Sequence, residues 1–94
     1  MKKSKDDLFT NTDYAIVRSA VRRLPGLLGI VIELRFWKKC TLDEIAVELG
    51  VSTRSIESAF TRALRMLREE CLRHPSFSRS EYETIQWFRS QNAA

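Results

Sequence analysis

The chain has 94 residues, of which 44% are hydrophobic, and its 16 Lys and Arg outnumber its 12 Asp and Glu. This length predicts one domain, and the small numbers of Gly (three) and Pro (two) argue against an all-β fold, which needs many turns. No run of 18 apolar residues and no apolar export signal occurs, so we expect a cytoplasmic protein without membrane spans. The net charge of +4 is compatible with a nucleic-acid partner.

Residues 1–11 are polar and basic, and we expect a flexible segment there. Asn11 or Thr12 can cap a first helix over about residues 13–24. The expected buried face of that helix is Ala15, Ile16, Ala20, Val21 and Leu24.

Pro25 suits the first turn of a second helix, which we expect to run to about residue 39. Its two glycines, Gly26 and Gly29, lower its intrinsic helicity and allow close approach of another helix. The residues available to the core are Leu27, Leu28, Val31, Ile32, Leu34 and Phe36.

Residues 41–68 have the spacing of a helix-turn-helix, the motif that places its second helix in the major groove of DNA. Thr41 and Glu44 can form a capping box at the start of the first motif helix. Gly50 stands where a chain leaving a helix often needs positive φ. Val51 can fill the corner of the turn, and Ser52 can cap the second motif helix.

The second motif helix is predicted to be amphipathic and to continue to about Arg73. An apolar stripe occupies one face, namely Ile56, Phe60, Ala63, Leu64 and Leu67. Polar side chains that can hydrogen-bond base edges and phosphates occupy its start and its opposite face. The candidate DNA-binding residues are Ser52, Thr53, Arg54, Ser55, Glu57, Ser58, Thr61, Arg62 and Arg65.

A last helix is predicted over about residues 81–91, after a break at 74–76. Ser78 or Ser80 can cap it, and Ser80 with Glu83 would form a second capping box. Its apolar stripe, formed by Tyr82, Ile85, Trp87 and Phe88, can either fold back on the core or form a two-fold interface. The sequence thus predicts an all-α domain of four to five helices. We divide it into residues 1–11, a DNA-binding unit over 12–74, and a C-terminal amphipathic helix within 75–94.

Little in the chain indicates catalysis or a cofactor. The one histidine, His74, follows a long helix and is interpreted as a terminal cap. Cys40 and Cys71 are isolated, lack metal-ligand spacing, and are expected to be reduced and at least half buried. We therefore predict no catalytic residue, no metal site and no cofactor.

The run from Leu24 to Glu69 resembles region 4 of bacterial sigma factors, and is somewhat closer to the extracytoplasmic-function type than to the housekeeping type. The matching segments are Leu24-Pro25, Glu33-Leu34-Arg35-Phe36, Thr41-Leu42-Asp43-Glu44-Ile45-Ala46, Leu49-Gly50-Val51-Ser52, Arg62-Ala63-Leu64 and Leu67-Arg68. Their order and spacing are gapless, and they cover about half of the chain.

This resemblance implies that the domain binds the promoter −35 element and that an apolar groove holds the flap of RNA polymerase. Carried over by position, Thr53, Arg54, Glu57, Ser58 and Arg62 would face the major groove. By the same transfer, Arg62, Arg65 and Arg68 would face phosphates or neighbouring activators. Two residues depart from the family pattern: Glu57 and Ala59 stand where basic or polar side chains are usual. Because 94 residues leave no room for a domain that melts the −10 element, the chain is either an excised domain or a stand-alone regulator, and we expect the latter.

Two other functions fit the same residues. One is a dimeric LuxR-type regulator that pairs through its last helix. The other is a module that binds RNA polymerase or another sigma subunit without touching DNA. All three hypotheses place the protein in transcription rather than in metabolism.

Overall fold

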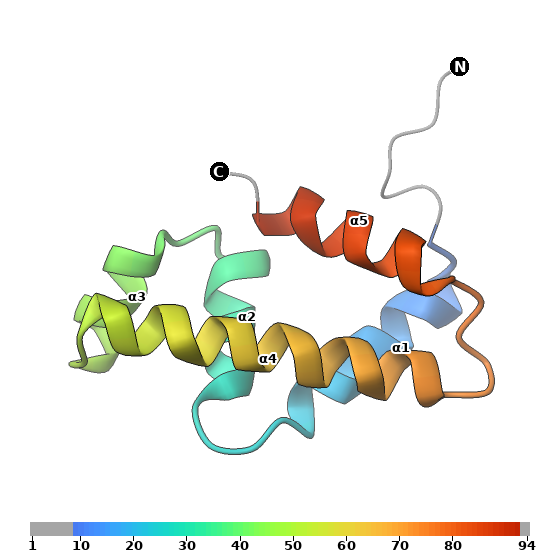
Figure 1. Cartoon of the computed structure of the whole chain (residues 1–94), viewed down its shortest axis with the longest axis horizontal. Helices are drawn as coiled ribbons and strands as arrows, with labels where there is room; N and C mark the ends of the chain where they lie inside the picture. Colours follow the sequence, from blue (N-terminus) through green and yellow to red (C-terminus); the bar gives the residue numbers. More distant parts are fainter. Residues whose placement is uncertain (1–8, 93–94) are drawn as a thin grey trace.

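The computed structural model describes residues 9–92 and contains five helices in that part of the chain (Figure 1). They are α1 (Asn11–Arg22), α2 (Leu28–Phe36), α3 (Leu42–Leu49), α4 (Thr53–Arg73) and α5 (Glu81–Asn92). The all-α prediction is confirmed. None of these helices is long and apolar enough to cross a membrane. The expected flexible segment at residues 1–11 lies mostly outside the described residues.

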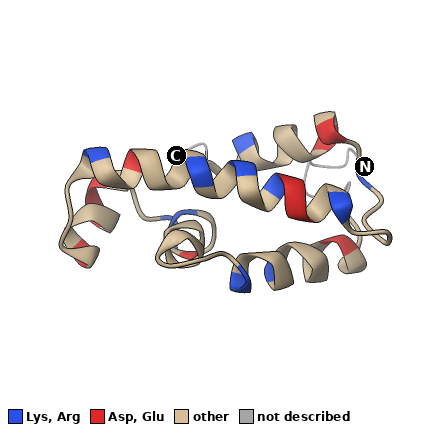
Figure 2. Ribbon diagram, turned by 60° about the horizontal axis from the view of Figure 1, so that its bottom comes forward, with Lys and Arg blue, Asp and Glu red and all other residues tan. Residues whose placement is uncertain are grey.

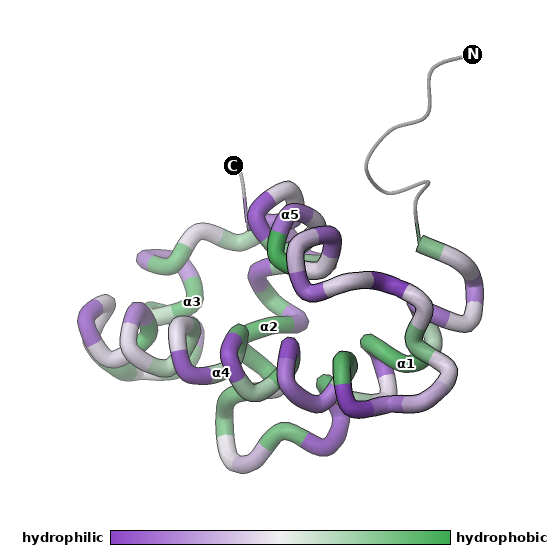
Figure 3. The backbone as a smooth tube through the Cα atoms, turned by 45° about the vertical axis from the view of Figure 1, so that its right-hand side comes forward, coloured by the Kyte–Doolittle hydropathy of each residue, from purple (hydrophilic) through white to green (hydrophobic). Residues whose placement is uncertain are grey.

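The longest helix, α4, crosses the whole molecule in Figure 1 and contacts each of the other four helices. It mixes hydrophobic and hydrophilic residues along its length (Figure 3), as expected of an amphipathic helix. Its buried face consists of Ile56, Phe60, Ala63, Leu67 and Cys71. The predicted end at Arg73 is confirmed, and His74 is the C-cap, whose Nδ1 accepts a hydrogen bond from the Ser76 N–H.

Helix α1 begins earlier than predicted. Thr10 caps it, and the Asp13 side chain returns a hydrogen bond to the Thr10 backbone, which completes a capping box. The prediction of Asn11 or Thr12 as the cap was wrong because only Thr10 has an acidic partner three residues later. The expected face was also partly wrong, since Val17 is fully buried and Ala15 is exposed.

Helix α2 is shorter than predicted at both ends. Pro25 lies in the turn that precedes it, where its carbonyl accepts the Leu28 N–H, and Gly26 takes a left-handed φ of 57°. Leu27 is therefore 48% exposed rather than part of the core. The expected close approach is confirmed at Gly29, because a Cβ there would lie 2.7 Å from the Val21 carbonyl oxygen.

Helix α5 follows the predicted bounds to within one residue, and its capping box between Ser80 and Glu83 is confirmed. It packs against α2 and α4 through Trp87 and Phe88, which are each 4% exposed. The rings of both residues lie 5.8 Å from that of Phe36. Of the apolar stripe, these two residues fold back on the core of the same chain, while Tyr82 remains 72% exposed.

The two cysteines are free thiols. Cys71 on α4 is fully buried, whereas Cys40, in the turn before α3, is half buried. The backbone carbonyl of Cys40 accepts a hydrogen bond from the Arg35 guanidinium, which also holds Asn92 at the end of α5. This arginine links α2, the entry to α3 and the last turn of α5.

Candidate nucleic-acid interface

The turn between α3 and α4 is held by local hydrogen bonds that the sequence predicts. Thr41 and Glu44 form the expected capping box at the start of α3. Gly50 ends α3 with a left-handed φ of 70°, a conformation that costs glycine little. Val51 donates its N–H to the Ala46 carbonyl, but its side chain is 39% exposed and does not fill the corner as we expected.

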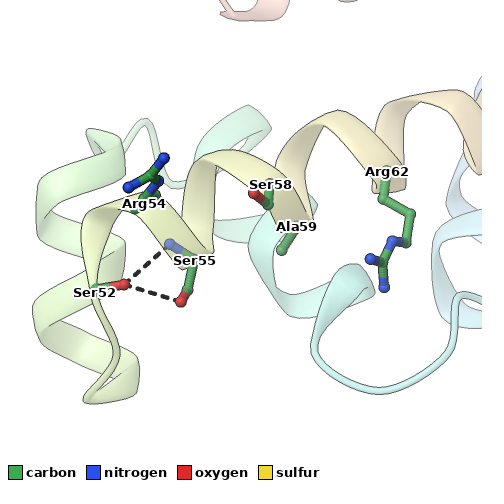
Figure 4. Close-up of a pocket in the computed structure, with 6 residues that line it drawn as sticks. All are labelled: Ser52, Arg54, Ser55, Ser58, Ala59 and Arg62. Atoms are coloured by element: carbon green, nitrogen blue, oxygen red, sulfur yellow. Dashed lines mark hydrogen bonds between the residues drawn. The ribbon is translucent and has the colours of Figure 1, made fainter.

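The start of α4 is fixed by Ser52, whose hydroxyl oxygen accepts the Ser55 N–H at 3.1 Å (Figure 4). The Ser52 hydroxyl also donates to Ser55 Oγ at 2.9 Å. Ile56 and Phe60 are buried behind this first turn and Ile45 of α3 lies in the same core. The N-terminal half of α4 is therefore anchored on one side and open on the other.

Two shallow depressions, of about 380 Å³ and about 360 Å³, lie along the open side of α4. The first is lined by Ser52, Arg54, Ser55, Ser58, Ala59 and Arg62. The second is lined by Glu57, Ser58, Thr61, Arg62 and Arg65. These depressions bring together every predicted DNA-binding residue except Thr53. Ala59 also contributes, and the small size of its side chain keeps the surface open there.

Several of these polar side chains already have partners within the protein. The Thr53 hydroxyl donates to Asp43 Oδ1 at 2.8 Å, which ties the start of α4 to the first turn of α3. The Thr61 hydroxyl donates to the Glu57 carbonyl at 3.0 Å. Sequence reasoning missed the role of Asp43, because its partner lies ten residues away across the turn.

The remaining side chains of the surface are exposed and have no hydrogen-bond or ion-pair partner within residues 9–92. They are Arg54, Glu57, Ser58, Arg62 and Arg65. Arg54 lies in the first turn of α4, while Arg62 and Arg65 lie two to three turns later, which corresponds to about 12–17 Å along the helix axis. Figure 2 shows basic residues spaced along α4 from its first turn to its last. This surface can donate many hydrogen bonds to an anionic partner and accept few.

The same part of the chain matches a known family model. Residues 14–67 match the model described as sigma-70, region 4. The chain belongs to this family. It is a sigma-factor-like DNA-binding domain, and its match covers most of α1, all of α2 and α3, and most of α4.

Curated relatives agree with this assignment. The RNA polymerase sigma-E factor of Streptomyces antibioticus is 33% identical over 66 residues, which cover 70% of this chain and 37% of the relative. The RNA polymerase sigma factor SigV of Bacillus subtilis strain 168 is 32% identical over 68 residues, which cover 72% of this chain and 39% of the relative. The region 4 domain described here thus spans less than two fifths of the length of either relative. No solved structure matches the chain at a significant level.

Within residues 9–92, no group of three or more His, Cys, Asp or Glu side chains is arranged to hold a metal ion. The chemistry that the surface offers is hydrogen bonding and electrostatic attraction.

Proposed function

We propose that this chain binds a promoter element in duplex DNA through the open face of α4, and that it does so together with RNA polymerase. The observation that carries the proposal is the set of unpartnered side chains on that face, of which three are arginines. A helix of this width fits the major groove, and the N-terminal residues of a recognition helix contact base edges. The names of the relatives, which are RNA polymerase sigma factors, support the polymerase contact.

Within this proposal, the nine predicted residues fall into two groups, according to whether their side chains form hydrogen bonds inside the protein. Arg54, Glu57 and Ser58 lie in the first two turns of α4 and contact bases. Arg62 and Arg65 lie further along and contact phosphates, which position the protein without reading sequence. Ser52, Thr53 and Ser55 keep the helix start in place through their internal hydrogen bonds, while the Thr61 hydroxyl bonds to the Glu57 carbonyl within the helix.

Two arginine substitutions test this division. Arg54→Ala should weaken binding to the preferred duplex by about 1–3 kcal/mol and relax one base position. Arg65→Ala should weaken binding to all duplexes similarly and reduce the slope of log K against log salt by about 1. The measurement is a fluorescence-anisotropy titration at several salt concentrations, with Arg73→Ala in the last turn of α4 as the matched control. Unchanged binding in both variants would refute the proposal.

Selection from random duplexes tests the polymerase contact. We expect the chain with RNA polymerase to enrich a single half-site more strongly than the chain alone. An inverted repeat enriched without polymerase would instead support the dimeric regulator. Binding that does not tighten as salt falls would support the module that acts without DNA.

A further inference from the structure

Glu57 is the one acidic side chain in the two depressions on α4. It is exposed, and within residues 9–92 its carboxylate has neither a hydrogen bond nor an ion pair. The Thr61 hydroxyl donates to the Glu57 backbone carbonyl and not to the carboxylate. A carboxylate pressed against a duplex is repelled by phosphates, so its presence on this face needs a compensating hydrogen-bond donor on the DNA.

The major groove offers few such donors. A carboxylate can only accept hydrogen bonds, and the base edges that donate in this groove are the N4 amino group of cytosine and the N6 amino group of adenine. Guanine and thymine present acceptors there, which would leave the carboxylate repelled and without a partner. Adenine places the N7 acceptor beside its amino group, so cytosine is the better partner for a carboxylate. Glu57 is thus expected to disfavour the bases that offer no hydrogen-bond donor in the major groove.

Arg54 lies three residues before Glu57 and has the opposite chemistry. Its guanidinium can only donate, and its best base partner is guanine, through O6 and N7. Three residues correspond to about 4.5 Å along a helix, and successive base pairs are about 3.4 Å apart. The two side chains therefore reach the same base pair or neighbouring ones.

We infer that Glu57 is a specificity-determining residue that selects cytosine at a base pair adjoining the one whose guanine Arg54 contacts, so that the bound element contains two neighbouring G·C pairs at this place. This inference rests on the proposed function, because it needs α4 to lie in the major groove. It goes beyond that function by naming the base and the group on it that is recognised. It also gives a physical role to the acidic side chain on an otherwise basic surface.

The test uses the 94-residue chain and a duplex selected by it, changed at the cytosine position to each of the other bases. The unaltered protein should prefer cytosine over all three other bases, and over guanine and thymine by roughly 5- to 150-fold, the range expected for one good base contact. Glu57→Gln should move the preference from cytosine to adenine, because an amide pairs with adenine N6 and N7. Arg54→Ala should abolish the guanine preference at the adjoining position and leave the cytosine preference in place.

Glu69→Gln is the matched control, since it makes the same change of charge on an exposed residue later in α4. It should leave the order of base preferences unchanged. If Glu57→Gln tightens binding to all four duplexes by one common factor, the carboxylate only repels the backbone, and the inference is wrong while the proposed function stands. An unaltered base preference in that variant has the same meaning. If the unaltered protein enriches no sequence at all, with or without RNA polymerase, both fail.

Discussion

At the scale of single residues, Asp13 is the most constrained charge among residues 9–92, and its side chain is fully buried. Its carboxylate accepts hydrogen bonds from the Ser78 N–H, the Ser78 hydroxyl and the Thr10 N–H, and the Arg79 guanidinium lies 3.6 Å away. Burial by itself would raise the pKa of this carboxyl, but the hydrogen bonds from Ser78 and Thr10 outweigh it and hold the pKa below its ordinary value. The carboxylate joins the start of α1 to the loop before α5.

We expect Asp13→Asn to lower the free energy of unfolding at neutral pH by about 1–3 kcal/mol, because the hydrogen bonds to a charged acceptor are lost. A carboxyl whose pKa is lowered on folding stabilises the protein above its unfolded pKa, near 4, and this contribution disappears as the pH falls through the folded pKa. The stability of Asp13→Asn should therefore fall less steeply in acid than that of the unaltered protein. Urea unfolding at several pH values measures this.

Some pH dependence should survive in that variant, since hydrogen bonds from Ser80 also lower the pKa of Glu83. Glu69→Gln, on an exposed residue, is the comparison. A parallel decline in acid for Asp13→Asn and for the unaltered protein would contradict this role for the buried carboxylate.

Residue-level signals predicted the helix-turn-helix better than they predicted α1. The helix-turn-helix is held by local features, namely the caps Thr41 and Ser52 and the left-handed Gly50. Their hydrogen-bond partners lie only a few positions away in the chain, so the sequence suffices to find them. At the start of α1, the adjacent residues Thr10, Asn11 and Thr12 can each cap a helix. Thr10 is the cap because Asp13 returns a hydrogen bond to its backbone. Asp13 is also held by Ser78, a partner 65 positions away that no local pattern reveals.

At the scale of elements, α5 lies entirely beyond the family match and still supplies part of the core. Trp87 stacks on Phe9 at 4.9 Å between ring centroids and meets Phe36 edge-on at 5.8 Å. Its indole N–H is buried without a hydrogen-bond partner among the described residues. Burial of the apolar ring stabilises the fold, while burial of the unpaired N–H offsets part of that stabilisation.

Trp87→Ala should lower the free energy of unfolding by about 3–5 kcal/mol, as is usual when a buried aromatic side chain is removed. Trp87→Phe should cost less, because it keeps an aromatic ring in the cluster and removes the unpaired N–H. Tyr82→Ala, on the exposed side of α5, should change stability by no more than about 0.5 kcal/mol. Denaturant unfolding of the three variants measures these differences, and a tolerated Trp87→Ala would show that α5 does not support the core.

The amphipathic pattern of α5 could be predicted from the sequence, but the surface against which its apolar stripe packs could not. A stripe of aromatic residues fits either the core of its own chain or a second copy, and the periodicity is identical in both cases. The outcome depends on Phe9 and Phe36, which come from distant segments and meet the stripe only in the folded chain. The exposed face of α4 was predictable for the opposite reason, because it depends on the period of a single helix.

At the scale of the whole molecule, α5 lies beside the later part of α4, where Ile85 and Phe88 line a groove with Leu64. The first turns of α4 project beyond it, next to α3 (Figure 1). Among residues 9–92, no other element covers the proposed DNA-binding surface. A duplex can approach it without any rearrangement of the helices.

We expect the protein to be monomeric at micromolar concentration and to bind one duplex site as a single copy. The reason is that Trp87 and Phe88, which a two-fold interface would need, are already buried in the core of the same chain. Light scattering of the free protein and the stoichiometry of its DNA complex are the measurements. Two copies on an inverted repeat would show that the interface lies elsewhere.

The two free thiols differ in burial, so they should also differ in their reactivity toward thiol reagents. Burial, with a smaller effect from the neighbouring Glu70 carboxylate, raises the pKa of Cys71 to about 12, so at neutral pH this sulfur carries a proton and does not attack disulfide or maleimide reagents. Cys40, half buried just ahead of α3, is left as the sulfur such reagents can reach. A colorimetric thiol assay should count one reactive group per native chain and two after denaturation. A fluorophore could then be attached to Cys40, just before the helix-turn-helix, without any substitution in the chain. A change in its emission would report the binding of DNA to the protein.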